Sequence, residues 1–284
     1  MSAARSRGWA VLLLLPALVV VLVFFVYPVF ALSARSFLEP TPGFGQYVDL
    51  VTNETTVTIL VRTLVVALLV TVVTLLLAYP YAYLMSLCGP GMRTFLLFLV
   101  LLPFWSSLMA RTFAWIVLLQ PSGPVAGFLG FLGLDGVKLL GSQLGVTIAM
   151  TQVLLPFMVL PLFNTMTGID RRLLSAAHSM GASRFRAFRT VYLPLSVPGV
   201  AAGSVLVFIL SLGFWVTPRL IGSPQQSLVG QLIETKVGKL LDFPGAGAIS
   251  VVLLVITVVL LLAVGGGVRA LVPGAKTDGG RDDG

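Results

Sequence analysis

The sequence predicts an all-α integral membrane protein with six membrane-spanning helices. Of its 284 residues, 57% are hydrophobic and 10% are charged, whereas soluble domains carry about 25% charged residues. The apolar residues fall in blocks of about twenty or more without the alternation of barrel strands. Because backbone polar groups cannot stay unpaired in hydrocarbon, blocks of this length are expected to be helices.

Six apolar blocks are expected to cross the bilayer as one permease-sized domain over residues 9–271. They cover residues 9–32, 57–85, 94–119, 143–166, 196–216 and 246–271. The first block has a signal peptide as its alternative, but signal-peptide cores are only about 7–15 residues long, which favours an uncleaved helix. The third block is long enough either to span with a tilt or to bend at Pro103.

The charges between the blocks predict the orientation of the chain. Five arginines and one aspartate lie between residues 167 and 189, and membrane proteins retain Lys and Arg on cytoplasmic loops. This bias places loop 167–195, the N-terminal residues 1–8 and the polar tail 272–284 in the cytoplasm. Residues 120–142 are expected to form an extramembrane or interfacial loop. The net charge of +8 therefore reflects membrane topology, and no nucleic-acid partner is expected.

Cysteine and histidine usage excludes several chemistries. Cys88 and His178 are the sole residues of their types, so no disulfide can form within the chain and no Cys/His metal site is expected. The chain contains no Gly-x-x-x-x-Gly-Lys-Ser/Thr phosphate loop. It is therefore not expected to be an enzyme or to hold a cofactor, and no catalytic residue is expected.

Residues 171–181 predict a short amphipathic helix that ends at a glycine. Leu173, Leu174, Ala177 and Met180 recur at helical spacing, which is typical of a helix with one apolar face. Gly181 follows, and glycine can end a helix by adopting a left-handed conformation. The exposed Ala and Leu face of this helix is suited to docking into a groove on a partner.

A second helix is expected directly after the glycine, over residues 182–191. Phe185 and Phe188 fall on one side of it, and Pro194 and Pro198 frame the entry to the next membrane block. The prediction is a helix-turn-helix that lies on the cytoplasmic surface.

At these positions the chain resembles a known family. Ala176-Ala177, Gly181 and Val191-Tyr192-Leu193-Pro194, at their spacing, are similar to the "EAA" loop of the membrane permeases of binding-protein-dependent ABC importers. One position departs, because Ser175 stands where the family has an acidic residue, so any ion pair made by that acid is in question. Further stretches resemble spermidine/putrescine-type permeases: Leu102–Trp105, Arg111–Trp115, Leu155–Leu162 and Phe214–Gly222.

The resemblance implies a six-helix type I ABC importer permease fold with a cytoplasmic coupling-helix loop, in the cell (inner) membrane. It implies three partners: a cytoplasmic ATPase dimer that binds the ATP, a second permease subunit and an extracytoplasmic solute-binding protein. It also implies a polyamine such as putrescine or spermidine, or a similar small organic solute. The loop residues implied to couple the permease to the ATPase are Ser175, Ala176, Ala177, Gly181, Ala182, Phe185, Phe188, Val191, Leu193 and Pro194.

Four residues are candidates for the solute path: Trp105, Arg111, Trp115 and Trp215. A charge within a membrane block is costly and often functional, and aromatic faces bind ammonium groups. The alternatives are a structural role for the arginine and a place in the interfacial aromatic belt for the tryptophans.

An ion-coupled secondary transporter is the alternative function. Such transporters carry ionisable residues inside the membrane for coupling, and the six blocks contain no Asp, Glu or His. A channel has no need of an ATPase docking loop. Both observations favour the ABC importer.

Overall fold

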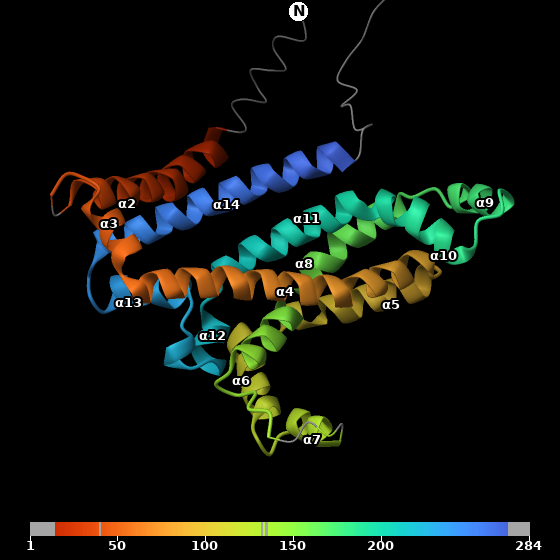
Figure 1. Ribbon diagram of the computed structural model, residues 1–284, viewed down its shortest axis with the longest axis horizontal. Coiled ribbons are helices and arrows are strands. Elements are labelled where there is room, and N and C mark those ends of the chain that lie inside the picture. Colours follow the sequence, from red (N-terminus) through yellow and green to blue (C-terminus); the bar gives the residue numbers. More distant parts are fainter. Residues whose placement is uncertain (1–14, 40, 132, 134–135, 272–284) are drawn as a thin grey trace, which may run out of the picture. The chain divides into compact units, whose positions relative to one another are not determined.

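The computed structural model describes residues 15–39, 41–131, 133 and 136–271, and the secondary structure in these ranges is helical throughout (Figure 1). The predicted cytoplasmic ends, residues 1–8 and 272–284, lie outside the described residues. The chain divides into two compact units, Met1–Thr58 with Leu232–Ile256 and Ile59–Gln231 with Thr257–Gly284. The division falls inside two long helices, α4 (Glu54–Leu87) and α14 (Phe243–Leu271).

Six helices of the described chain are long and apolar enough to cross a membrane. They are Leu15–Leu38, Glu54–Leu87, Leu108–Phe131, Gln143–Thr167, Arg184–Leu212 and Phe243–Gly267. A shorter apolar stretch, Pro90–Trp105, precedes the third. The predicted all-α fold with six apolar helices is thus confirmed, with different bounds for the third and fifth helices.

The block at residues 94–119 does not form one helix. Helix α5 (Pro90–Leu101) continues into the 3-10 turn η2 (Leu102–Trp105), and α6 (Leu108–Leu119) begins after two serines in extended conformation. Pro103 has no N–H to donate to the preceding turn, and the Ser106 hydroxyl bonds the Pro103 carbonyl at 2.8 Å. The chain therefore breaks close to Pro103, and α7 (Pro124–Phe131) forms within the segment that was expected to be a loop.

The first unit packs the first apolar helix against α14. A π turn, η1 (Leu22–Val26), leads into α2 (Tyr27–Leu38), and α3 (Gly45–Thr52) follows. A Cβ on Gly247 of α14 would lie 2.6 Å from the carbonyl oxygen of Leu32, so glycine permits this close contact. The buried Ser36 hydroxyl bonds the Tyr47 hydroxyl at 2.7 Å and joins α2 to α3.

The second unit is built on α8 (Gln143–Thr167) and α11 (Leu193–Leu212). Gly199 and Gly203 of α11 face α8, where added Cβ atoms would lie 2.7 Å from Thr165 Oγ1 and 2.7 Å from Met158 Sδ. Two glycines four residues apart let membrane helices approach closely. The core of this unit contains the fully buried Met150, Leu154, Met158 and Leu162 of α8.

The second helix expected in the cytoplasmic loop is part of the fifth span. Helix α10 (Arg184–Ala187) continues through the π turn η3 (Phe188–Tyr192) into α11, past Pro194. Each π turn ends with a hydrogen bond across five residues, donated by the residue just before a proline. The Tyr27 N–H donates to the Leu22 carbonyl before Pro28, and the Leu193 N–H donates to the Phe188 carbonyl before Pro194. A widened turn accommodates the missing N–H and the bulk of the proline ring, so these prolines do not end the helices.

We expect Gly199→Ala to lower the stability of the folded permease by about 1–3 kcal/mol, because the new Cβ overlaps Thr165 and the Pro161 carbonyl. Thermal unfolding in detergent, followed by size-exclusion chromatography, measures the change. Gly265→Ala on α14 is the matched control, since no atom lies within 4 Å of its Cβ position. Equal melting temperatures for the two variants would contradict the close contact of α8 with α11.

Candidate functional site

The loop between the fourth and fifth spans begins with a short helix that ends in a Schellman motif. Helix α9 (Arg172–Ser179) starts where the Asp170 carboxylate accepts the Arg172 N–H at 2.9 Å. At its end the N–H of Gly181 bonds the His178 carbonyl at 2.9 Å, and the N–H of Ala182 bonds the Ala177 carbonyl at 3.0 Å. Gly181 has φ +84°, which confirms that it stops the helix in a left-handed conformation.

Two further side chains complete the turn. His178 Nδ1 lies 2.9 Å from the Ala182 carbonyl oxygen, and the Ser183 hydroxyl accepts the Arg186 N–H at 3.3 Å as the N-cap of α10. The loop is therefore a helix-turn-helix, as predicted, whose second arm continues directly into the fifth span.

The apolar side chains of the loop divide into an inner and an outer set. Ala177 is 6% exposed and Ala187 is fully buried, and the two helices that carry them, α9 and α10, contact each other. The expected Ala face of α9 is therefore only partly available for docking, since Ala177 is turned into the permease. Met180 and Phe185 are 83% and 74% exposed and point outward from the two sides of the turn.

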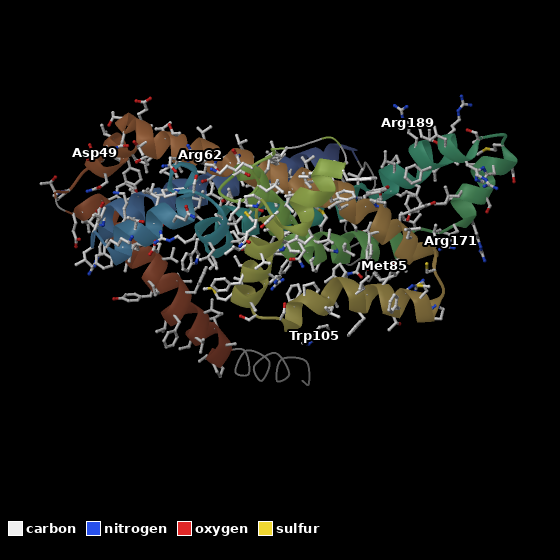
Figure 2. The ribbon with its side chains drawn as sticks, turned by 90° about the horizontal axis from the view of Figure 1, so that it is seen from below. Asp49, Arg62, Met85, Trp105, Arg171 and Arg189 are labelled. Carbon is white, nitrogen blue, oxygen red and sulfur yellow. The ribbon has the colours of Figure 1, made fainter. Side chains whose placement is uncertain are left out.

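The other predicted loop residues are distributed between these sets. Ser175 and Ala176 are exposed, Ala182, Phe188 and Val191 are half-buried, and Leu193 and Pro194 are exposed on the span itself. Four arginines of the loop are exposed as well: Arg172, Arg184, Arg186 and Arg189, the last labelled in Figure 2. The exposed part of the loop thus combines apolar and cationic side chains, and we call Leu173, Met180, Phe185 and these four arginines the outer turn surface.

Three of the four solute-path candidates come from elements that pack together. Helix α6 carries Arg111 and Trp115, and it packs on α12 (Val216–Ile221), which Trp215 caps. The Trp115 indole N–H donates to Gln152 Oε1 of α8 at 3.3 Å. Trp105 lies before the chain break, 73% exposed, with its ring 5.9 Å from Phe98 (Figure 2), and it is not brought to the other three by a contact.

Another arginine of the apolar helices has a defined structural role. Arg62 of α4 donates to the Gln225 carbonyl at 2.6 Å, and the neighbouring Thr63 hydroxyl accepts the Val229 N–H at 2.9 Å. Together they fasten the segment between α12 and α13 (Val229–Gly238) to the N-terminal part of α4.

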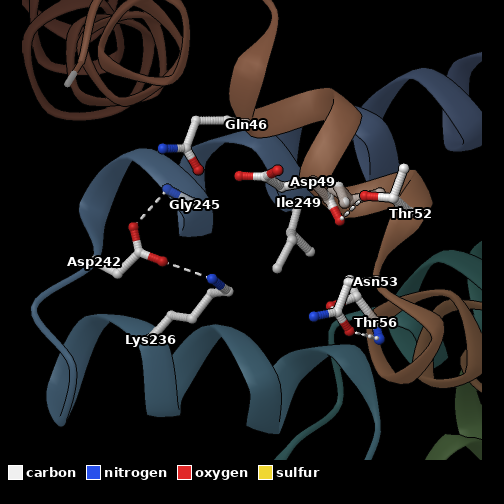
Figure 3. A pocket seen from close by; sticks show the side chains of 10 residues that line it. Gln46, Asp49, Thr52, Asn53, Thr56, Lys236, Asp242, Gly245 and Ile249 are labelled. Atoms are coloured by element: carbon white, nitrogen blue, oxygen red, sulfur yellow. Dashed lines mark hydrogen bonds and ion pairs between the residues drawn. The ribbon is translucent and has the colours of Figure 1, made fainter. Parts of the chain in front are cut away.

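A polar recess in the first unit had no signal in the sequence. It encloses about 630 Å³ among α3, the start of α4, α13 and α14 (Figure 3). Lys236 Nζ donates to Asp242 at 2.5 Å, and the Gly245 N–H donates to the same carboxylate at 2.8 Å. Burial acts to raise the pKa of Asp242, but these hydrogen bonds and the Lys236 charge outweigh it and lower the pKa. The Asp242 carboxylate therefore stays ionised at neutral pH, and Asp49 supplies a second carboxylate across the recess.

These features define a class of protein: a multi-pass membrane permease whose apolar bundle carries a basic helix-turn-helix between its fourth and fifth spans. The chain belongs to the family of binding-protein-dependent transport system inner membrane components, whose model matches residues 92–276. It is the permease subunit of an ABC importer in the inner membrane, and such permeases are not enzymes. Family membership sets aside the ion-coupled alternative.

Several curated proteins are similar over most of the chain. The spermidine/putrescine transport system permease protein PotB of Haemophilus influenzae is 36% identical over 193 residues, 67% of this chain and 68% of that protein. PotB of Escherichia coli is 32% identical over 206 residues, 72% of this chain and 75% of that protein. The inner membrane ABC transporter permease protein YdcU of Escherichia coli is 33% identical over 223 residues, with 74% and 71% covered.

Solved structures share the fold. A chain of a bacterial ABC transporter involved in the import of the acidic polysaccharide alginate matches with a TM-score of 0.71 at 22% identity. The match covers 93% of this chain and 96% of that chain. A second structure of such a transporter, in complex with a periplasmic protein bound to an alginate pentasaccharide, matches with a TM-score of 0.70 at 21% identity, covering 94% and 96% of the chains. At this identity the likeness establishes the permease fold.

Proposed function

We propose that loop 167–195 is the docking site for a cytoplasmic ATPase dimer. The ATPase drives transport of the solute through a path formed by this permease and a second permease subunit, which is a different chain. The proposal rests on the exposure of Met180 and Phe185 on a turn whose backbone is fixed by the Schellman motif at Gly181. Apolar side chains on a short, rigid helix are suited to insertion into a groove of a partner protein.

The charges around the turn add a second requirement for the partner. The arginines of the outer turn surface favour a groove with an acidic rim, because complementary charge speeds and orients association. Ser175 is exposed on α9, so the groove must accept a neutral hydroxyl where related loops present a carboxylate.

The docking proposal is tested by Phe185→Asp and Met180→Asp. Each places an unpaired carboxylate in the docked groove, which is costly to bury, and we expect at least about a tenfold loss of the ATPase subunit that co-purifies with the permease. Phe131→Asp on α7 is the matched control, because Phe131 is 88% exposed and lies outside the loop. Normal ATPase recovery with both loop variants would refute docking at this turn.

The N- and C-termini and loop 167–195 are proposed to face the cytoplasm, on the arginine bias described above. Cys88, the single cysteine of the chain, lies in the turn after α4. That turn adjoins the loop, because the Arg171 guanidinium reaches the Ser86 carbonyl. Cys88 therefore reports the side of the membrane on which the loop lies.

We expect a membrane-impermeant maleimide to label Cys88 in inverted vesicles and not in right-side-out vesicles. A Cys88→Ser variant that carries Phe131→Cys should give the opposite pattern, since α7 belongs to the other side in this orientation. Labelling of Cys88 from the outside would overturn the proposed orientation.

The solute is proposed to be a polyamine such as putrescine or spermidine, or a similar small organic cation. Support comes from the PotB relatives, whose names specify spermidine and putrescine, and from the tryptophans near the packed α6 and α12. Because the apolar helices offer the cation no Asp or Glu side chain within the six predicted blocks, aromatic faces, carbonyl groups and the second permease must stabilise its charge.

Calorimetry on the partner solute-binding protein tests the solute. We expect binding of putrescine or spermidine, and no binding of molybdate or alginate oligosaccharides, which are tested because molybdenum and alginate are named for other similar proteins. Binding of molybdate or an alginate oligosaccharide alone would remove the polyamine proposal, while the assignment as an importer permease would stand.

A further inference from the structure

The inner end of α4 has a carbonyl group that its own helix cannot satisfy. The last carbonyls of a helix lack intrahelical donors, and the residue four positions after Ser86 is Pro90, which has no N–H. The guanidinium of Arg171, from the first residues of the cytoplasmic loop, donates to this Ser86 carbonyl. A cation is also favoured at a helix C-terminus by the helix dipole.

A second contact joins the same residue to the end of the loop. The Ser86 hydroxyl donates to the Tyr83 carbonyl at 2.7 Å and lies 3.3 Å from the Tyr192 hydroxyl. With the Ser86 proton used in this way, the Tyr192 hydroxyl is the donor to Ser86 Oγ. Ser86 and Tyr192 are 5% and 4% exposed, so this hydrogen bond is shielded from water.

Aromatic packing reinforces these hydrogen bonds. The Tyr83 ring of α4 packs edge-on against Tyr192 and Phe188 of η3, with centroids 5.1 Å and 5.6 Å apart. Phe188 and Tyr192 stack on each other with an interplanar angle of 17°, because the π turn places them on one face. Edge-to-face aromatic pairs of this kind favour one fixed arrangement.

The outer part of α4 is also fastened. Arg62 and Thr63 bind the segment from Gln225 to Val229, as described above. A helix rises about 1.5 Å per residue, so α4 connects the cytoplasmic loop to this outer segment through one continuous element (Figure 1). Energetic coupling between distant sites travels through rigid elements and contacts of this kind.

We propose that Arg171 and Tyr192 form a latch on Ser86, so that displacement of the loop moves α4 together with α8 and α11. The loop is joined covalently to α8 and α11 alone. Apart from the latch, α4 is linked to the loop by aromatic packing, and to α11 by the Tyr79 and Ser196 hydroxyls, which lie 3.0 Å apart. Arg171 is thus a positioning residue for transport, and α4 carries the displacement from the ATPase side to the outer segment. This inference rests on the proposed docking of an ATPase on the loop.

The test uses the assembled transporter, with its ATPase, second permease and binding protein, in proteoliposomes. Arg171→Met removes the charged hydrogen bond, whereas Arg172→Met removes the same charge from an exposed neighbour. We expect Arg171→Met to retain the ATPase within about twofold, and Arg172→Met, whose side chain belongs to the outer turn surface, to lower ATPase recovery without changing the solute transported per ATP hydrolysed. We expect Arg171→Met alone to lower the solute transported per ATP hydrolysed about tenfold, as loss of a charge-assisted hydrogen bond implies.

Tyr192→Phe keeps the ring packing and removes only the hydroxyl, so it decides the matter if Arg171→Met fails to fold. Tyr192→Phe should lower the solute transported per ATP hydrolysed severalfold. The double variant Ser86→Ala/Tyr192→Phe should lower this ratio no further than either single substitution, because both substitutions remove the same hydrogen bond between Ser86 and Tyr192. A melting temperature that falls while the transport ratio stays at the wild-type value would reduce the contact to a stabilising one and overturn the latch.

Two other outcomes would also overturn the latch. If Arg171→Met and Arg172→Met have equal transport ratios, the Ser86 contact does not carry coupling. If Arg171→Met loses the ATPase subunit, Arg171 is a docking residue, and the docking proposal stands without the latch. The docking proposal is tested separately: if Phe185→Asp and Met180→Asp both retain the ATPase subunit, docking at this turn is refuted.

Discussion

The close approach of α8 and α11 sets the position of the loop that joins these two helices in the second unit. Gly199 and Gly203 allow the two backbones to touch, with Thr165 and Met158 filling the space that side chains would occupy. The loop connects the inner ends of these two helices, so their separation determines where its two arms can lie. A larger residue at either glycine would separate the helices and with them the arms of the loop.

Several prolines and one helix end are compensated, as a chain in hydrocarbon requires. Pro28 and Pro194 are preceded by π turns that absorb the missing donor, whereas Pro103 precedes a break in the chain at two serines. Pro90 leaves the Ser86 carbonyl without a helical donor, and an arginine from the loop supplies one. The same constraint, that buried backbone groups must find partners, therefore yields a continuous helix, a broken helix and a tertiary contact.

Sequence patterns predicted the parts of the site that depend on local chemistry. The position of Gly181 at the end of α9 follows from the apolar periodicity before it and from the freedom of glycine to adopt positive φ. Phe185 was correctly placed on the loop, but Ala177 was expected on its docking face and is buried against the second arm. Periodicity identifies an apolar face, yet it cannot say whether the chain itself or a partner covers that face.

Composition and spacing by themselves determined the helical membrane class, the six apolar helices, the basic loop and its glycine stop, because these depend on short-range chemistry and on solubility in lipid. The continuation of α10 into the fifth span and the recess between Asp49 and Asp242 were decided by tertiary structure, whereas the break after Pro103 was one of two outcomes that the sequence had left open. Tertiary structure also decided that Arg171 binds the Ser86 carbonyl, which lies 85 positions away along the chain. Such pairings depend on how helices distant in sequence pack together, and a single sequence carries no local signal for them.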